Sequence, residues 1–291
     1  MYKGSFVALL TPFKNGQVDE AAFQSFVEWQ ISEGTNGLVP CGTTGESPTL
    51  THTEHKRVTE MCIEVTAGRV PVVAGAGSNS TAEAVDLAKH AESAGASSVL
   101  VVSPYYNKPT QEGLYAHYKA VNDAVGIPII VYNIPGRSVI NVNLDTMKRL
   151  AELPNIAGVK DATSDLALPI EYTREIGADF CQMSGEDATA IPYLAAGGHG
   201  CISVTANIMP AKCAEQHAAW NAGDVARAQA IQLELINVHK AMFCETSPGP
   251  VKYAAELMGI CSAEQRLPMV DICDASKAQV KAALSAAGLL G

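Results

Sequence analysis

Short apolar runs rich in β-branched residues recur eight times before residue 205, and this repetition limits the possible folds more than any other feature. Continuous apolar runs of this length are typical of strands that are buried on both faces of a parallel sheet. The predicted strands are residues 6–10, 37–40, 70–74, 98–102, 127–132, 156–160, 180–184 and 200–204.

Helical patterns separate these strands, and several carry recognisable start signals. Asp19 and Thr53 are the predicted N-caps of the helices at 20–33 and 54–66, and Ser80 or Thr81 is that of the next helix. That next helix is predicted at 82–94, and the remaining helices between strands are predicted at 111–124, 143–152, 166–176 and 187–196. Eight strand–helix units spaced by roughly 20–35 residues predict a (β/α)8 TIM barrel, which needs about 250 residues.

A doubly wound sheet is the alternative fold, but no Gly-x-Gly-x-x-Gly turn follows any predicted strand. After the last strand, residues 210–221 give the final barrel helix. Three further helices are predicted without any strand between them, at 224–243, 250–258 and 275–289. We therefore expect a barrel catalytic domain at 1–223 and a three-helix C-terminal domain at 224–291.

Composition narrows the class of protein. The chain has 291 residues, of which 47% are hydrophobic and 17% are charged, and no stretch approaches the roughly 20 apolar residues of a membrane span. The run Phe6–Leu10 is too short for the apolar core of a signal peptide, so we expect a cytoplasmic protein without a membrane partner. A net charge of −10, without a cluster of Lys and Arg, argues against a nucleic-acid partner.

The eight cysteines show neither a Cys-x-x-Cys pair nor a histidine at zinc-finger spacing. Several lie inside apolar runs, as Cys181 and Cys201 do. We expect reduced, buried cysteines and no metal site.

One predicted strand, Ile156–Lys160, ends on a lysine that small and polar residues follow at once. Burial disfavours a charged amine, and an uncharged amine is a nucleophile that can form a Schiff base with a carbonyl substrate. The simpler interpretation is a lysine whose stem covers apolar surface while its ammonium group reaches water.

Other chemically useful residues follow the remaining predicted strands, and in a barrel all these strand ends meet at the catalytic face. The segment Cys41–Ser47 contains two glycines and two threonines, so it could bind a carboxylate through backbone N–H groups or be an ordinary loop. Tyr105, Tyr106 and Tyr132 could relay protons, or could only cap the core with their rings. Arg137 could bind a second carboxylate, or be a solvated surface charge.

Four motifs together make the chain resemble a known enzyme family. They are Gly42-Thr43-Thr44-Gly45-Glu46, Tyr105-Tyr106, Tyr132-Asn133-Ile134-Pro135-Gly136-Arg137 and Gly158-Val159-Lys160-Asp161-Ala162-Thr163. In combination they are similar to the class I pyruvate-dependent lyases related to N-acetylneuraminate lyase, and the resemblance covers the whole chain. Within that family, Arg137 favours the synthases that join pyruvate to L-aspartate 4-semialdehyde.

The resemblance implies that Lys160 forms an imine with pyruvate, and that the derived enamine adds to the aldehyde. Ring closure then gives the hydroxylated dihydrodipicolinate precursor of diaminopimelate and lysine. No cofactor is implied, because the covalent lysine imine does the chemistry. The implied catalytic residues are Lys160, Tyr132, Thr44 and Tyr106, with Tyr106 reaching the site of a neighbouring subunit. The implied substrate-binding residues are Thr43, Thr44, Arg137, Gly185 and Ile202.

The same resemblance implies a homotetramer built as a dimer of dimers, and an inhibitory lysine site at a subunit interface. The matching lysine-binding positions are Ser47, His52, His55, Asn79, Glu83 and Tyr105. Glu83 can pair with an ammonium group, whereas the simpler interpretation is two solvated histidines and an ordinary helix glutamate. Two other functions stay open: a related aldolase or lyase acting on a sugar acid, and a non-catalytic small-molecule sensor on the same barrel.

Overall fold

Strands and helices alternate along the chain in the computed structural model, which describes residues 2–290. These residues group into two units. The first unit contains Tyr2, Lys3 and Pro71–Ile202, and the second contains Gly4–Val70 and residues 203–290.

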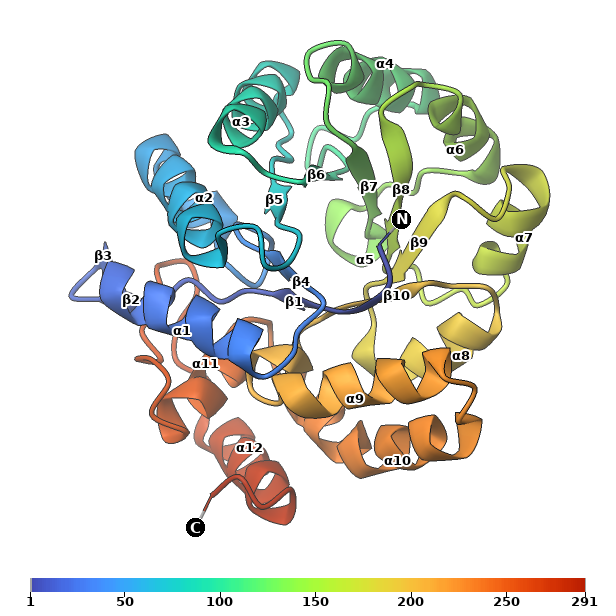
Figure 1. Ribbon diagram of the computed structural model, residues 1–291. Coiled ribbons are helices and arrows are strands. Elements are labelled where there is room, and N and C mark those ends of the chain that lie inside the picture. Colours follow the sequence, from blue (N-terminus) through green and yellow to red (C-terminus); the bar gives the residue numbers. More distant parts are fainter. Residues whose placement is uncertain (1, 291) are drawn as a thin grey trace. The chain divides into compact units, whose positions relative to one another are not determined.

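Parallel strands form the core of the first unit, and each one pairs with the next strand in the chain (Figure 1). Their order is β5 Val73–Gly75, β6 Ser98–Val102, β7 Ile129–Asn133, β8 Ile156–Asp161, β9 Cys181–Ser184 and β10 Gly200–Ser203. Nearly all their residues are buried, which explains why the runs are apolar throughout instead of alternating. Gly158 permits the close approach of β8 to β9, because a Cβ there would lie 2.2 Å from the Cys181 carbonyl oxygen.

Helices follow these strands. They are α3 Thr81–Ala94, α4 Gln111–Asn122, α5 Pro135–Ser138, α6 Leu144–Ala151, α7 Leu168–Glu175 and α8 Ala190–Ala195, with the 3-10 turn η2 Asp187–Thr189 before α8. Side-chain caps fix two of the starts: Thr110 accepts from the Gly113 N–H at 3.2 Å, and Asn143 accepts from the Thr146 N–H at 2.8 Å.

The second unit contains the parallel pair β1 Gly4–Ala8 and β4 Gly37–Val39, in which Val7 lies opposite Leu38. It also contains α1 Glu20–Ser32, η1 Ser47–Thr49, α2 His52–Thr66, η3 Thr205–Asn207 and α9 Pro210–Asn221. A small antiparallel hairpin, β2 Phe13–Lys14 and β3 Gln17–Val18, was not predicted. Its signal was the Asn15-Gly16 turn, a dipeptide that favours tight hairpins.

Three helices follow α9, as predicted: α10 Val225–Ala241, α11 Gly249–Leu257 and α12 Asp274–Ala286. Helix α10 packs on α9 and α12, and α11 packs on α12. Asp224 caps α10 by accepting from the Arg227 N–H at 3.0 Å, although the domain boundary at 223/224 itself stays a prediction. The eight successive strand–helix repeats, parallel within each unit, confirm the predicted barrel class.

Two predictions need correction. The N-cap of α2 is Thr51 and not Thr53, because Thr51 exchanges hydrogen bonds with Glu54 three residues later, whereas the residue three after Thr53 is Lys56, which cannot accept one. The cysteines are all free, but burial holds for only five of them: Cys41, Cys62, Cys181, Cys201 and Cys213. Cys273 is exposed because it precedes α12 in a polar stretch.

Within residues 2–290, none of the helices combines the length and apolar character needed to cross a membrane.

Candidate functional site

Lys160 lies near the carboxyl end of β8 and is only 7% exposed. Its register partners are Tyr132 on β7 and Met183 on β9. The ammonium nitrogen lies 4.3 Å from the centroid of the Tyr132 ring, which is a cation–π contact. Within the described chain Lys160 has no ion-pair partner, and its ammonium group faces the Tyr132 ring. A buried amine that no carboxylate holds is suited to react as a nucleophile.

Gly185 gives the Lys160 side chain room. Its N–H donates to the Asp161 carbonyl oxygen at 2.6 Å, and an added Cβ would lie 3.3 Å from Lys160 Cε and 2.8 Å from Ala162 Cβ. A larger residue would therefore press on the lysine and its strand. Ile202 is buried on β10, which pairs with β9.

Two acidic residues near Lys160 were not predicted. Asp161 accepts a hydrogen bond from the Thr163 N–H at 2.8 Å, and burial raises the pKa of its carboxyl group. Burial also raises the pKa of Glu186, with Asp187 adding to the effect and the charge of Lys160 opposing it. Within residues 2–290, neither carboxylate forms an ion pair with the Lys160 ammonium group. The sequence signal for Asp161 was its position directly after Lys160 at the end of a predicted strand.

The residues predicted to reach a partner subunit or a second substrate are exposed. Tyr106 is 93% exposed and has a left-handed backbone with φ of 71°. Arg137 is exposed in the short helix α5, two residues after Pro135. The structure thus presents both side chains at the surface of the first unit.

The first unit also brings together three residues of the predicted lysine site. Tyr105 is half-buried, and its pKa is raised by burial and by the nearby charge of Glu83, while a hydrogen bond with the Asn79 backbone opposes the shift. Ser78 donates to the Glu83 carboxylate, and Asn107 Nδ2 donates to the Asn79 carbonyl oxygen at 2.8 Å. A carboxylate, a phenol and backbone groups therefore lie in one cluster.

In the second unit, Thr43 and Thr44 lie in a tight turn after β4. The Gly45 N–H donates to the Gly42 carbonyl oxygen at 3.1 Å, and the Glu46 N–H donates to that of Thr43 at 3.1 Å. Within residues 2–290, the N–H groups of Thr43 and Thr44 donate to no protein acceptor, although Thr44 is 4% exposed. Unpaired N–H groups at a buried position are rare, and successive ones form a concave site for an anion.

Three further predicted residues lie close to this turn in the chain. Ser47 begins η1, His52 is exposed at the first position of α2, and His55 is buried one turn later. The Cys41 thiol donates to the His55 carbonyl oxygen at 3.4 Å, which ties the helix to the start of the turn.

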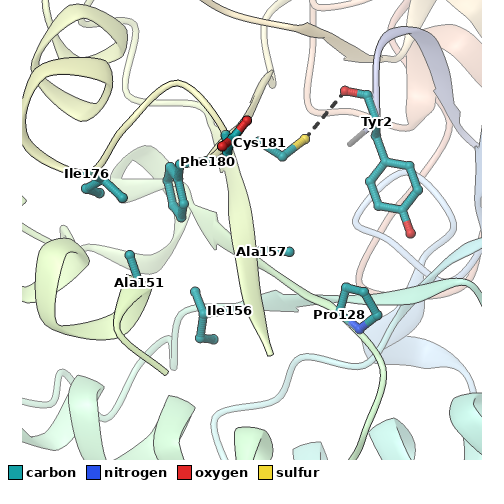
Figure 2. A pocket seen from close by; sticks show the side chains of 9 residues that line it. Tyr2, Pro128, Ala151, Ile156, Ala157, Ile176, Phe180 and Cys181 are labelled. Carbon is teal, nitrogen blue, oxygen red and sulfur yellow. Dashed lines mark hydrogen bonds between the residues drawn. The ribbon is translucent and has the colours of Figure 1, made fainter. Parts of the chain in front are cut away.

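A cavity of about 590 Å³ in the first unit lies at the other end of the strands (Figure 2). Its lining includes Ile156 and Cys181, the first residues of β8 and β9, and the Cys181 thiol donates to the Tyr2 carbonyl oxygen at 3.5 Å. The lining contains no lysine or histidine, and barrel enzymes react at the carboxyl ends of their strands. We therefore place the candidate active site at the Lys160 end. Residues 2–290 contain no group of three His, Cys, Asp or Glu side chains arranged to hold a metal ion.

The chain is similar to known proteins along almost its whole length. The model of the Dihydrodipicolinate synthetase family matches residues 1–287. The 4-hydroxy-tetrahydrodipicolinate synthase of Rhodospirillum centenum is 62% identical over 290 residues, which cover 100% of both chains.

Two solved structures are also similar. A chloride-inhibited dihydrodipicolinate synthase from Acinetobacter baumannii, complexed with pyruvate, is 43% identical, with a TM-score of 0.97 over 100% of both chains. The enzyme from Cyanidioschyzon merolae with lysine bound is 36% identical, with a TM-score of 0.96 over 99% of both chains.

Proposed function

The chain belongs to the Dihydrodipicolinate synthetase family, and from this premise we propose that it condenses pyruvate with L-aspartate 4-semialdehyde to 4-hydroxy-tetrahydrodipicolinate in lysine biosynthesis. The observation that carries the proposal is Lys160, a buried amine that faces an aromatic ring and has no ion pair within the described residues. The cysteines are free and five of them are buried, which supports a location in a reducing compartment such as the cytoplasm.

In the proposed reaction, Lys160 Nζ attacks the pyruvate carbonyl carbon, and water leaves to give an imine. Loss of a methyl proton gives an enamine, whose carbon attacks the aldehyde carbon of the second substrate. The amine of that substrate then attacks the imine carbon and closes the ring, which releases Lys160. Tyr132 moves protons in these steps together with Thr44, and the closeness of Tyr132 to the Lys160 amine supports this role.

The two carboxylates of the substrates need separate binding groups. The unpaired N–H groups of Thr43 and Thr44 suit the pyruvate carboxylate. Arg137 binds the carboxylate of the semialdehyde, where a guanidinium fork can form two parallel hydrogen bonds. Gly185 and Ile202 line the pyruvate pocket, and the room that Gly185 leaves beside Lys160 supports this assignment.

Reduction with borohydride in the presence of pyruvate tests the covalent step. We expect one reduced pyruvate adduct per chain by intact mass, with peptide mapping placing it on Lys160. Lys252 is an internal control, because it is also buried and should carry no adduct. An adduct without turnover of the semialdehyde indicates a related aldolase for another aldehyde, and a folded enzyme without an adduct indicates a sensor.

Shared active sites are the second part of the proposal: Tyr106 completes the site of a neighbouring subunit in a homotetramer. Its 93% exposure supports a role outside its own chain. Mixing inactive Tyr106→Phe and Lys160→Ala chains should restore part of the activity after subunit exchange. Light scattering measures the assembly, and failure to recover activity in verified hybrids would count against sharing.

Inhibition by lysine is the third part. Glu83 binds the ammonium group of the inhibitor, and Tyr105 and Asn79 bind its carboxylate, while Ser47, His52 and His55 complete the site. The cluster of Glu83, Tyr105 and Asn79 supports this proposal. Calorimetry should detect lysine binding to the native enzyme and none to Glu83→Gln; equal binding by both would exclude this site.

A further inference from the structure

A fully buried ion pair connects the turn of Thr43 and Thr44 to the C-terminal helices. Glu46 ends that turn and is 3% exposed, and its carboxylate pairs with Lys252 of α11, which is 0% exposed. Lys252 Nζ also donates to the Glu264 carbonyl oxygen at 2.7 Å and lies 4.1 Å from the centroid of the Phe13 ring. Lys252 is thus held from three directions.

The second carboxylate oxygen of Glu46 is held as well. It accepts from the backbone N–H of Arg266 at 3.2 Å. The guanidinium of Arg266 binds Glu54 at 2.6 and 2.8 Å, and donates to the carbonyl oxygens of Thr49 and Gly16 at 3.0 and 2.8 Å. Residues 252–266 therefore clamp both the end of the turn and the start of α2.

Burial of a charged pair is weak evidence for stability, because desolvation opposes the attraction between the charges. Its geometric effect is clearer. Glu46 has a left-handed backbone with φ of 54°, which is unfavourable for a residue other than glycine. Its N–H donates to the carbonyl oxygen of Thr43, and its own carbonyl accepts from the Thr49 N–H at 3.0 Å, so its position sets the shape of the turn on both sides.

We infer that Glu46 is a positioning residue, held by Lys252 and Arg266, that keeps the N–H groups of Thr43 and Thr44 directed at the pyruvate carboxylate. The inference rests on the proposed function. Glu46 acts through the turn and does not touch the substrate. The C-terminal helices thereby contribute to substrate affinity.

Steady-state kinetics of Glu46→Gln and of the double variant Glu46→Gln/Lys252→Met test this inference. The double variant removes both buried charges while keeping similar side-chain shapes, so it leaves no unpaired buried charge. We expect the KM for pyruvate to rise roughly tenfold in both, as for the loss of one good contact to a carboxylate. The KM for the semialdehyde should change less than about twofold, because Arg137 and not the turn binds that substrate.

Glu28→Gln is the matched control. Glu28 forms a bidentate pair with Arg69 in the same unit, at 2.5 and 2.8 Å, but this pair is exposed and distant in the chain from the turn. Both KM values of this variant should equal those of the native enzyme.

The outcomes separate the two proposals. An unchanged pyruvate KM in folded Glu46 variants, with a native enzyme that still forms the borohydride adduct, would overturn the positioning role alone. Equal increases in both KM values would also overturn it, because a general loss of structure affects both substrates. A native enzyme without a pyruvate adduct would overturn the proposed function instead. If neither Glu46 variant folds, Lys252→Arg is the replacement test, because it keeps the positive charge on a side chain of different length. An unchanged pyruvate KM in this variant contradicts the inference.

Discussion

Two buried lysines of this chain differ in their ion-pair partners, and this difference distinguishes a candidate catalytic lysine from a structural one. Lys160 in the first unit and Lys252 in the second each lie over an aromatic ring, 4.3 Å from the Tyr132 centroid and 4.1 Å from the Phe13 centroid. Lys252 has a carboxylate and a carbonyl oxygen as partners, whereas within residues 2–290 Lys160 has no ion pair. Lys252 is held by its partners, whereas no carboxylate holds Lys160, as its proposed role as a nucleophile requires.

The largest expected effect is on the activity of Lys160→Met. Turnover should fall by roughly a thousandfold or more, because the nucleophile of the covalent route is lost. The free energy of unfolding should change by less than about 1 kcal/mol, since Met fills a similar volume and no partner charge is left unpaired. Turnover assays and urea unfolding measure the two quantities. Appreciable residual turnover would show that Lys160 is not the nucleophile.

The opposite pattern is expected of Lys252→Met. This change leaves Glu46 buried without its partner and should lower the free energy of unfolding by about 3–5 kcal/mol. Urea unfolding measures it, with Lys160→Met as the matched control. Equal stability of the two variants would show that burial alone, and not pairing, distinguishes the two lysines.

A smaller effect is expected from acid. The guanidinium of Arg266, which binds Glu54, lowers the pKa of that carboxyl group from 4.5 to about 2. A lowered pKa in the folded state contributes stability that is complete above pH 4.5 and is lost as the pH falls toward 2. Between these pH values, the free energy of unfolding should depend less steeply on pH in Glu54→Gln than in the native enzyme. Identical pH profiles of the two proteins would contradict the role of this pair.

The smallest effect is expected from the exposed pair of Arg69 and Glu28. Solvent screening makes such pairs weak, so the urea midpoint of Glu28→Gln should be unchanged within error. A clear shift would show that exposed pairs in this unit contribute to stability, and would weaken the contrast with the buried pair.

The sequence was sufficient to predict the barrel, and it singled out Lys160 as the candidate nucleophile. Strands buried on both faces are apolar throughout, so β6 and β8 could be read directly from their runs. Lys160 was found because a charge at the end of an apolar strand is unusual. The roles of the other site residues came from a resemblance, and they stay predictions that the experiments above test.

The buried pair of Glu46 and Lys252 could not have been predicted in the same way. Lys252 lies in an ordinary helical pattern, and Arg266 binds a residue 220 positions away in the chain. Such pairs depend on tertiary contacts that leave no local periodicity. The Thr51 cap was different, since Glu54 three residues later was a local signal that should have decided against Thr53.

The clamp on Glu46 also has a consequence for how the enzyme is made. Synthesis on the ribosome runs from the N-terminus, so the turn after β4 leaves the ribosome long before Lys252 and Arg266 exist. Contacts between residues so far apart form late, because the chain must first close a long loop. The turn of Thr43 and Thr44 therefore gains its anchors only when translation is nearly complete, and a chain that stops before α11 contains Lys160 and the turn without them.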